Sequence, residues 1–129
     1  MIDVKQVIVM RKDLNMRKGK MVAQGAHAAM KFLVDNSTSD SPTELRVELS
    51  PAEAQWLFGG AFTKIILGCD SEEELRELIM RAELFGIDAY PIVDSGKTEF
   101  NGVPTLTCAS FGPAFVEDID KVTGHLKPI

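Results

Sequence analysis

The sequence has no long hydrophobic run, few cysteines and no overall excess of positive charge. Its longest uncharged apolar stretches, such as residues 7–10 and 65–69, fall far short of the roughly 18 apolar residues that a membrane helix needs. The first residues do not combine a basic segment with an apolar run, so we expect no signal peptide, no membrane span and a cytoplasmic location. Cys69 and Cys108 form no CxxC pair and each lies in an apolar run, which predicts two reduced, buried thiols without a catalytic role.

The chain is long enough to bury a core without a disulfide or a structural metal. Its 129 residues are 45% hydrophobic and 26% charged, which indicates one globular domain over residues 1–129. The formal net charge of −5 argues against a nucleic-acid partner, but residues 1–31 carry +5 and residues 32–129 carry −10. A local basic patch can still attract a polyanion, because each charge acts over about 8 Å at physiological salt. A solvated basic turn is the alternative interpretation.

Apolar periodicity predicts strands interleaved with helices. We expect strands at residues 4–11, 62–69, 89–93 and 104–111. We expect helices at residues 19–34, 51–56 and 72–85, and a final short helix that opens at Gly112-Pro113 and ends near Thr123-Gly124. Residues 35–49 are polar and rich in turn formers, which is typical of a flexible surface loop.

Local signals refine the boundaries of these elements. Ser50 with Glu53, and Ser71 with Glu74, have the spacing of capping boxes at helix starts. Asn101-Gly102 is a tight-turn pair, so we expect the last two strands to form an antiparallel hairpin. Strands that alternate with helices indicate an α/β layer fold, with mostly parallel pairing and one antiparallel element from the hairpin.

Polar side chains follow one face of the helix expected at residues 19–34. Lys20, Gln24, His27 and Lys31 are spaced by four, three and four residues, so they lie along one stripe. A glycine and a lysine at the helix start combine free backbone N–H groups with a positive side chain, which suits a phosphate. No GxxxxGKS/T loop is present, so binding of a nucleoside triphosphate is not supported. The solvated face of an amphipathic helix is the alternative.

A second polar cluster, Asp94-Ser95-Gly96-Lys97-Thr98, follows an apolar strand. Ligands of open α/β sheets gather at strand ends. The Asp carboxylate with the Thr hydroxyl could hold and partly deprotonate a water, while Gly96 allows a sharp turn. An ordinary Asx turn explains the same residue types. His27 and His125 are too far apart in the sequence to indicate a metal site by spacing.

Several segments, in order along nearly the whole chain, carry a more specific signal. They are RKDLNMRKGK at residues 11–20, Ala23-Gln24 with His27-Ala28, DSGKT at residues 94–98, and IDKVTGHLK at residues 119–127. Together they resemble the peptidyl-tRNA hydrolase type II family. The resemblance implies an α/β three-layer fold with a four-stranded mixed sheet, helices on both faces and a homodimer. It also implies hydrolysis of the ester between a peptide and the 3′ ribose of tRNA, without a metal or an organic cofactor.

The residues that correspond to the family's functional positions are Lys20, Gln24, His27, Asp94 and Thr98. Ester hydrolysis needs a positioned water, a proton acceptor and a group that stabilises the developing oxyanion. We expect Asp94 and Thr98 to orient or deprotonate the water, and Lys20 to stabilise the tetrahedral intermediate or to tune Asp94. Gln24 and His27 would complete the hydrogen bonding or support the helix. The side chains expected to hold tRNA phosphates are Arg11, Lys12, Arg17, Lys18 and Lys97.

Two positions depart from the family pattern, which usually has Ala after the Asp and Gln after the Thr. Ser95 and Glu99 stand there instead, and the charge of Glu99 would weaken phosphate binding. Two other functions remain open: a family member that binds tRNA or another RNA without hydrolysing it, and a protein-interaction domain on the same scaffold. The acidic composition favours the latter, whereas Lys20, Asp94 and Thr98 together argue against a binder that lacks catalysis.

Overall fold

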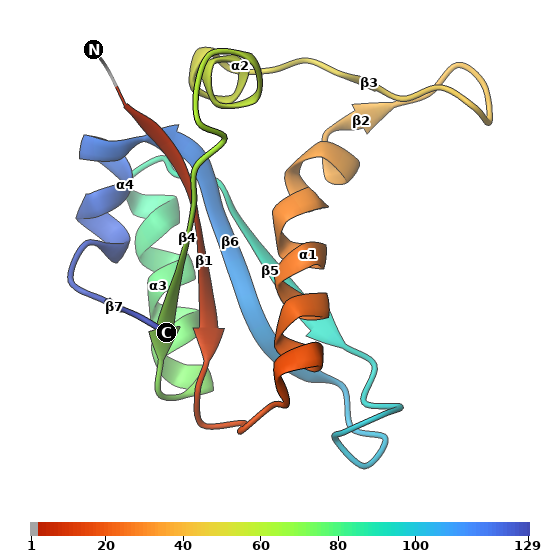
Figure 1. Ribbon diagram of the computed structural model, residues 1–129, viewed down its shortest axis with the longest axis vertical. Coiled ribbons are helices and arrows are strands. Elements are labelled where there is room, and N and C mark those ends of the chain that lie inside the picture. The colour runs from red at the N-terminus through yellow and green to blue at the C-terminus, as the bar shows by residue number, and fades with distance from the viewer. Residues whose placement is uncertain (1–2) are drawn as a thin grey trace.

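A mixed sheet with strands in the order β5-β6-β1-β4-β7 separates two helical layers (Figure 1). The computed structural model describes residues 3–129, with α1 on one face of the sheet and α3 and α4 on the other. The strands are β1 (Val4–Arg11), β2 (Ser37–Thr38), β3 (Arg46–Val47), β4 (Lys64–Cys69), β5 (Ala89–Asp94), β6 (Thr105–Phe115) and β7 (Lys127–Pro128). The helices are α1 (Lys18–Asp35), α2 (Pro51–Phe58), α3 (Glu72–Leu84) and α4 (Val116–Thr123). The expected α/β fold with helices on both faces of a mixed sheet is confirmed.

The expectation of mostly parallel pairing is wrong. β1 pairs with β4 in parallel, but β6 is antiparallel to both β1 and β5, and β7 is antiparallel to β4. The three strands that are joined through helices, β1, β4 and β5, do run in one direction, as crossover connections require. β6 runs the opposite way and lies between β5 and β1, so β5 has no parallel neighbour within residues 3–129. Local periodicity contains no information about this strand order.

Two further differences concern the C-terminal third of the chain. The sheet has five strands rather than four, because the two-residue β7 pairs with Leu67 and Gly68, and a strand this short leaves no periodic signal. β6 also continues through Gly112-Pro113 to Phe115, so the last helix begins at Val116 instead of at Gly112. The register between β1 and β6 shifts beside this dipeptide, and a bulge of this kind lets a strand contain a proline.

β1 is buried on both faces, as its unbroken apolar run predicts. Val7 and Val9 belong to the core under α3 and α4, while Ile8 and Met10 belong to the core under α1, and all four are at most 2% exposed. Burying a side chain of this size stabilises the fold by roughly 1.5 to 3 kcal/mol. The sheet therefore holds α1 in a fixed place on one of its faces.

The local capping signals are confirmed in part. Ser50 and Glu53 form a complete capping box at the start of α2. Ser71 accepts a hydrogen bond from the backbone N–H of Glu74, but the Glu74 carboxylate accepts from the N–H of Asp70 and not from that of the cap residue. The polar segment after α1 contains a small antiparallel ladder of β2 and β3.

Arg11, at the end of β1, is an internal structural group. Its side chain is 10% exposed, and its Nη1 donates to the carbonyl oxygen of Leu106 on β6 at 2.9 Å. Its Nε and Nη2 donate to the two carboxylate oxygens of Asp13 at 3.1 and 2.6 Å. The hydrogen bond from this guanidinium holds the pKa of Asp13 below its ordinary value. Arg11 thus fixes the turn after β1 against the neighbouring strand.

The change Arg11→Met should lower the free energy of unfolding by about 2 to 3 kcal/mol, because the Leu106 carbonyl and the Asp13 carboxylate lose a buried partner. Urea unfolding measures this loss. Lys12→Met is the matched control, since its ion pair with Asp70 is exposed and should contribute less than about 1 kcal/mol. Equal losses in the two variants would contradict the structural assignment of Arg11.

Candidate active site

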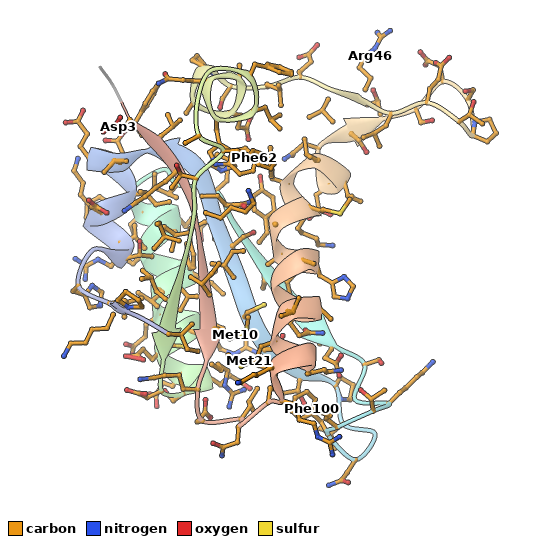
Figure 2. All side chains as sticks on the ribbon, in the orientation of Figure 1. Asp3, Met10, Met21, Arg46, Phe62 and Phe100 are labelled. Carbon is orange, nitrogen blue, oxygen red and sulfur yellow. The ribbon has the colours of Figure 1, made fainter. Side chains whose placement is uncertain are left out.

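The first turn of α1 and the end of β5 meet at one ion pair. Lys20 Nζ lies 2.8 Å from Asp94 Oδ1, and the two side chains are 14% and 11% exposed. The same Nζ donates to Thr98 Oγ1, also at 2.8 Å. Side chains more than 70 positions apart in the sequence therefore share one small site. Phe100, from the loop after β5, lies beside the N-terminal end of α1 (Figure 2), and its ring centroid is 5.8 Å from Lys20 Nζ.

Gln24, one turn further along α1, extends this cluster into the protein. Its Nε2 donates to Asp94 Oδ1 at 3.3 Å, and its Oε1 accepts from the hydroxyl of Thr107 at 2.6 Å. Gln24 is 3% exposed and Thr107, on β6, is fully buried. The hydroxyl of Thr107 fixes the orientation of the amide, so that its NH₂ group faces the carboxylate. Thr107 is not among the residues expected at the site, because threonine is an ordinary residue in a strand.

The loop after β5 is shaped around the second oxygen of Asp94. The backbone N–H of Gly96 donates to Asp94 Oδ2 at 2.9 Å, which is the Asx turn that the residue types favour. Gly96 has a φ of +83°, and a Cβ there would lie 2.3 Å from the carbonyl oxygen of Val103. Only glycine fits this position. The Asx turn uses Oδ2 of Asp94 and the contact with Lys20 uses Oδ1. Asp94 can therefore form the turn and act in the site at the same time.

The charge state of Asp94 follows from these contacts. The hydrogen bond from Lys20, and after it the N–H of Gly96, hold the pKa of Asp94 below its ordinary value. Asp94 is therefore a carboxylate at neutral pH. It is a weaker base than an ordinary aspartate and a well-oriented hydrogen-bond acceptor.

The other two residues of the α1 stripe lie outside the cluster. His27 is exposed, and no hydrogen bond joins its ring to another residue in the range 3–129. Lys31 Nζ lies 3.1 Å from Asp35 on the same helix. The structure thus brings together Lys20 and Gln24 with Asp94, and it leaves His27 and Lys31 further along the helix.

The basic side chains expected at a phosphate surface have different surroundings. Lys18 and Lys97 are exposed, and Arg17 is 89% exposed with its Nε 3.8 Å from Glu99 Oε1. Lys12 is half-exposed and pairs with Asp70 at 3.1 Å. The guanidinium of Arg11 instead donates to the Leu106 carbonyl and to the Asp13 carboxylate. Its position therefore does not fit the expected role in phosphate binding.

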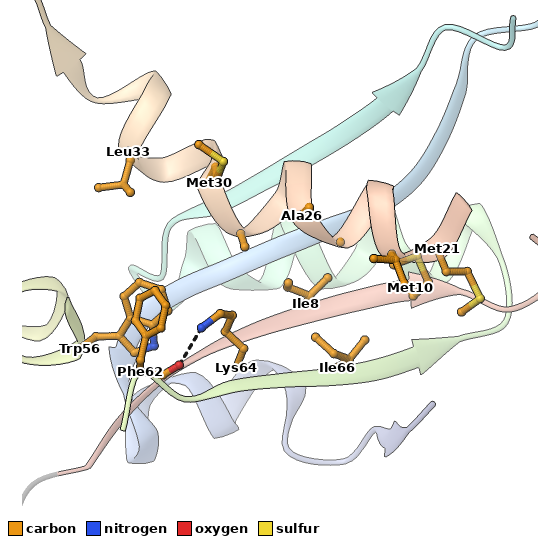
Figure 3. Close-up of a pocket in the computed structure, with 13 residues that line it drawn as sticks. Ile8, Met10, Met21, Ala26, Met30, Leu33, Trp56, Phe62, Lys64 and Ile66 are labelled. Carbon is orange, nitrogen blue, oxygen red and sulfur yellow. Dashed lines mark hydrogen bonds between the residues drawn. The ribbon is translucent and has the colours of Figure 1, made fainter. Parts of the chain in front are cut away.

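A groove between α1 and strands β1 and β4 has a volume of about 550 Å³ and is lined almost wholly by apolar side chains (Figure 3). Its charged lining group is Lys64, whose Nζ donates to the carbonyl oxygen of Phe62 and whose pKa is lowered by burial. None of the lining residues in the described chain is a carboxylate or belongs to the Lys20–Asp94 cluster. This groove therefore lacks the groups that ester hydrolysis requires.

The two cysteines are buried and free, as expected. Burial raises the pKa of both thiols to about 11, so each is protonated at neutral pH and a poor nucleophile. Among residues 3–129 no helix is long and apolar enough to cross a membrane. The same range contains no group of three or more His, Cys, Asp or Glu side chains that could hold a metal ion.

The change Asp94→Asn should reduce stability in a pH-dependent way. Because the folded pKa of Asp94 lies below the ordinary value of 3.8, its stabilising contribution is fully present above that value and is lost as pH falls through the folded pKa. The difference in unfolding free energy between the wild type and the variant should stay constant from neutral pH to about pH 5 and shrink at lower pH. Denaturant unfolding across this range measures it, and a difference that does not change with pH would contradict the ionised pair.

Comparison with known proteins identifies the family. The family described as "Peptidyl-tRNA hydrolase PTH2" matches residues 4–129. A relative named peptidyl-tRNA hydrolase from Methanopyrus kandleri is 38% identical over 122 residues, which is 95% of each chain. Another of that name from Thermococcus onnurineus is 40% identical over 131 residues, covering 98% of each chain.

A solved structure of a protein of unknown function from Agrobacterium has a similar fold. Its TM-score is 0.59 at 13% identity, and the match covers 100% of this chain and 99% of the other, so the likeness concerns the fold alone. The family assignment rests on the sequence match along residues 4–129 and on relatives 38 to 40% identical over nearly their whole length. This chain belongs to the peptidyl-tRNA hydrolase PTH2 family.

Proposed function

We propose that this protein hydrolyses the ester bond of peptidyl-tRNA and releases the peptide and free tRNA. The observation that carries the proposal is the cluster of Lys20, Gln24, Asp94 and Thr98 at the start of α1. It combines an ionised acceptor with an ammonium donor, and both side chains keep a small exposed fraction, 11% for Asp94 and 14% for Lys20. We place the reaction in the cytoplasm and propose a homodimer on the family resemblance, without assigning a surface to the dimer.

Asp94 keeps an acceptor site that its described partners do not use. An ionised carboxylate offers about four acceptor sites. Within the described residues, Lys20 and Gln24 use one oxygen and the N–H of Gly96 uses the other. One site is left on Oδ2, and a water held there would be oriented by a fixed carboxylate. This arrangement supports Asp94 as the group that positions the attacking water.

The ammonium group of Lys20 likewise keeps one N–H donor that its described partners do not use. An ammonium has three N–H donors, and those of Lys20 are directed to Asp94, to Thr98 and to one remaining position. The start of α1 adds to this charge, because Arg17 at the N-cap makes no side-chain capping bond to a described residue and the first turn contains no acid. The third donor of Lys20 and the helix N-terminus would stabilise an oxyanion as it forms.

The reaction balances with these groups. The water oxygen attacks the ester carbonyl carbon, the bond from that carbon to the 3′ ribose oxygen breaks, and a proton passes from the water to the departing ribose oxygen. The lowered pKa of Asp94 favours a role in orienting the water and relaying its proton over one as a strong base. His27 is exposed and follows Gln24 by one turn on the same stripe of α1, so we propose that it contacts the substrate.

The phosphates of tRNA would lie at the N-terminal end of α1. Arg17 and Lys18 lie within three residues of Lys20, and Lys97 directly precedes Thr98, so these exposed cations belong to the two segments that form the proposed ester site. Lys12 adds a fourth, partly paired charge. We leave Arg11 out of this surface because its guanidinium is buried.

The alternatives fit the site less well. A protein that only binds RNA has no need for a lysine and an aspartate held at 2.8 Å beside a hydroxyl. A protein-interaction domain would not require the exposed cations at one end of α1. Neither alternative explains why the tight turn at Gly96 orients the Asp94 carboxylate.

Lys20→Ala and Asp94→Asn should each slow single-turnover cleavage of peptidyl-tRNA by about 100- to 1000-fold, because each removes a group that acts on the transition state. Binding of deacylated tRNA, measured in parallel, separates lost chemistry from lost affinity. The control is Lys5→Ala, since Lys5 forms an ion pair of the same 2.8 Å length with Asp120. Near-normal cleavage by both site variants would refute the proposed reaction.

Charge changes near the start of α1 should alter tRNA affinity in opposite directions. Lys18→Ala should weaken binding of deacylated tRNA and reduce the salt dependence of log Kd by about one charge. Glu99→Gln should strengthen binding, because it removes the carboxylate that lies 3.8 Å from Arg17. Gel retardation over a series of salt concentrations measures both, with Lys121→Ala on α4 as the control. Binding that is insensitive to salt would contradict this surface.

A further inference from the structure

A β-bulge on β6 lies next to the end of β5 that carries Asp94. In the ladder between these strands, Cys108 and Leu106 pair with the consecutive positions 92 and 93 of β5, so Thr107 is an extra residue on β6. Leu106 belongs to the core under α3 and α4, whereas Cys108 belongs to the core under α1. Residues two apart in a regular strand face the same side of the sheet, so the bulge changes the face to which β6 directs its side chains.

The bulge brings two successive residues of β6 into contact with the same residue of α1, which lies across this face of the sheet (Figure 1). The hydroxyl of Thr107 donates to Gln24 Oε1 at 2.6 Å, and the thiol of Cys108 donates to the backbone carbonyl of Gln24 at 3.5 Å. Successive residues of a regular strand face opposite sides of the sheet, so both contacts depend on the bulge. They hold Gln24 by its side chain and by its backbone.

The amide of Gln24 has one favourable orientation between Thr107 and Asp94. In the observed orientation, Oε1 accepts from Thr107 and Nε2 donates to Asp94 Oδ1 at 3.3 Å. In the reversed orientation, the amide oxygen and the carboxylate would be two acceptors that face each other. The hydroxyl of Thr107 would then have to donate to the carbonyl of Ile92, which lies 3.4 Å away, at the limit of a hydrogen bond. The hydroxyl and the carboxylate therefore favour the same orientation.

This orientation matters for the carboxylate of Asp94. Lys20 and Gln24 both donate to Oδ1, and the N–H of Gly96 donates to Oδ2. Without the bond from Gln24, Oδ1 keeps a single described donor, and rotation of the carboxylate about the Cβ–Cγ bond is less restricted. The acceptor site on Oδ2 that we assign to the attacking water would move with it. A displacement of this kind slows a reaction although every reacting group is still present.

Resting on the function proposed above, we propose that Thr107 is a positioning residue for the hydrolysis and acts on Asp94 through the amide of Gln24. Thr107 is fully buried, so it touches neither the water nor the ester. Its hydroxyl is the first donor of a chain in which Thr107 donates to Gln24 and Gln24 donates to Asp94. Hydrogen bonds in such a chain polarise one another, and the negative charge at its end strengthens both.

The test removes the hydroxyl and keeps the shape of the side chain. Thr107→Val should slow single-turnover cleavage of peptidyl-tRNA at saturating enzyme by about 5- to 20-fold, as expected for the loss of one hydrogen bond. The enzyme concentration that gives half of the maximal rate should not change, because Thr107 does not contact the substrate. Thr107→Ser keeps the hydroxyl and should retain the wild-type rate to within about twofold.

A second pair of variants keeps the test valid if Thr107→Val does not fold. Thr107→Ala and Thr107→Ser differ only in the hydroxyl, so their rates should differ by the same factor of about 5 to 20. Urea unfolding shows which variants are folded under the conditions of the assay. The matched control is Thr123→Val on α4. Thr123 is 1% exposed and donates to the carbonyl of Ile119 at 3.3 Å, so this change should lower stability without slowing cleavage by the folded enzyme.

The background Gln24→Met shows whether the effect passes through the amide. In this background no amide is left to orient, so the added change Thr107→Val should slow cleavage by less than about twofold. An undiminished effect of Thr107→Val in this background would overturn the proposal, because the hydroxyl would then act by another route.

Three other results would also overturn the positioning role while the wild type is active. They are a wild-type rate in folded Thr107→Val, equal rates in Thr107→Ala and Thr107→Ser, and an equal loss of rate in folded Thr123→Val. Failure of the wild type to cleave any peptidyl-tRNA would instead refute the proposed function itself, so the two failures are distinguishable.

Discussion

The ion pair between Lys20 and Asp94 is the interaction on which the site depends. It joins the first turn of α1 to the end of β5, with a distance of 2.8 Å between charged atoms that are mostly shielded from water. A pair in this environment is stabilising only when further hydrogen bonds satisfy both ions. Gln24 and the N–H of Gly96 do so for the carboxylate, and Thr98 does so for the ammonium. The cluster is thus fixed before any substrate arrives.

The fold places these groups by two independent constraints. The buried face of α1 packs on β1 and β6, and the bond from Thr107 to Gln24 fixes the helix near the end of β5. The loop that follows β5 closes on itself through Gly96, whose positive φ and close contact with Val103 allow no side chain. A rigid helix and a tight loop then meet at one carboxylate. Preorganisation of this kind lets a few polar groups act strongly on a transition state.

The sequence predicted the two halves of the site because each belongs to a local pattern. Lys20 lies at a helix start and Asp94 at a strand end, and both places are recognisable from neighbouring residues. Thr107 could not be predicted, since its role depends on which helix covers β6. Arg11 was expected to bind phosphate because it begins a basic segment, whereas its burial depends on the distant Leu106 carbonyl. The prediction of mostly parallel pairing failed for the same reason, because local periodicity does not show which distant strands pair.

A double-mutant cycle measures how far Lys20 and Asp94 depend on each other in the reaction. Single-turnover cleavage of peptidyl-tRNA is measured for Lys20→Ala, for Asp94→Asn and for the variant that carries both changes. If the two side chains act as one unit, the double variant should cleave at about the rate of the slower single variant. If the two losses multiply instead, Lys20 and Asp94 act independently, and the account of a single preorganised pair is contradicted.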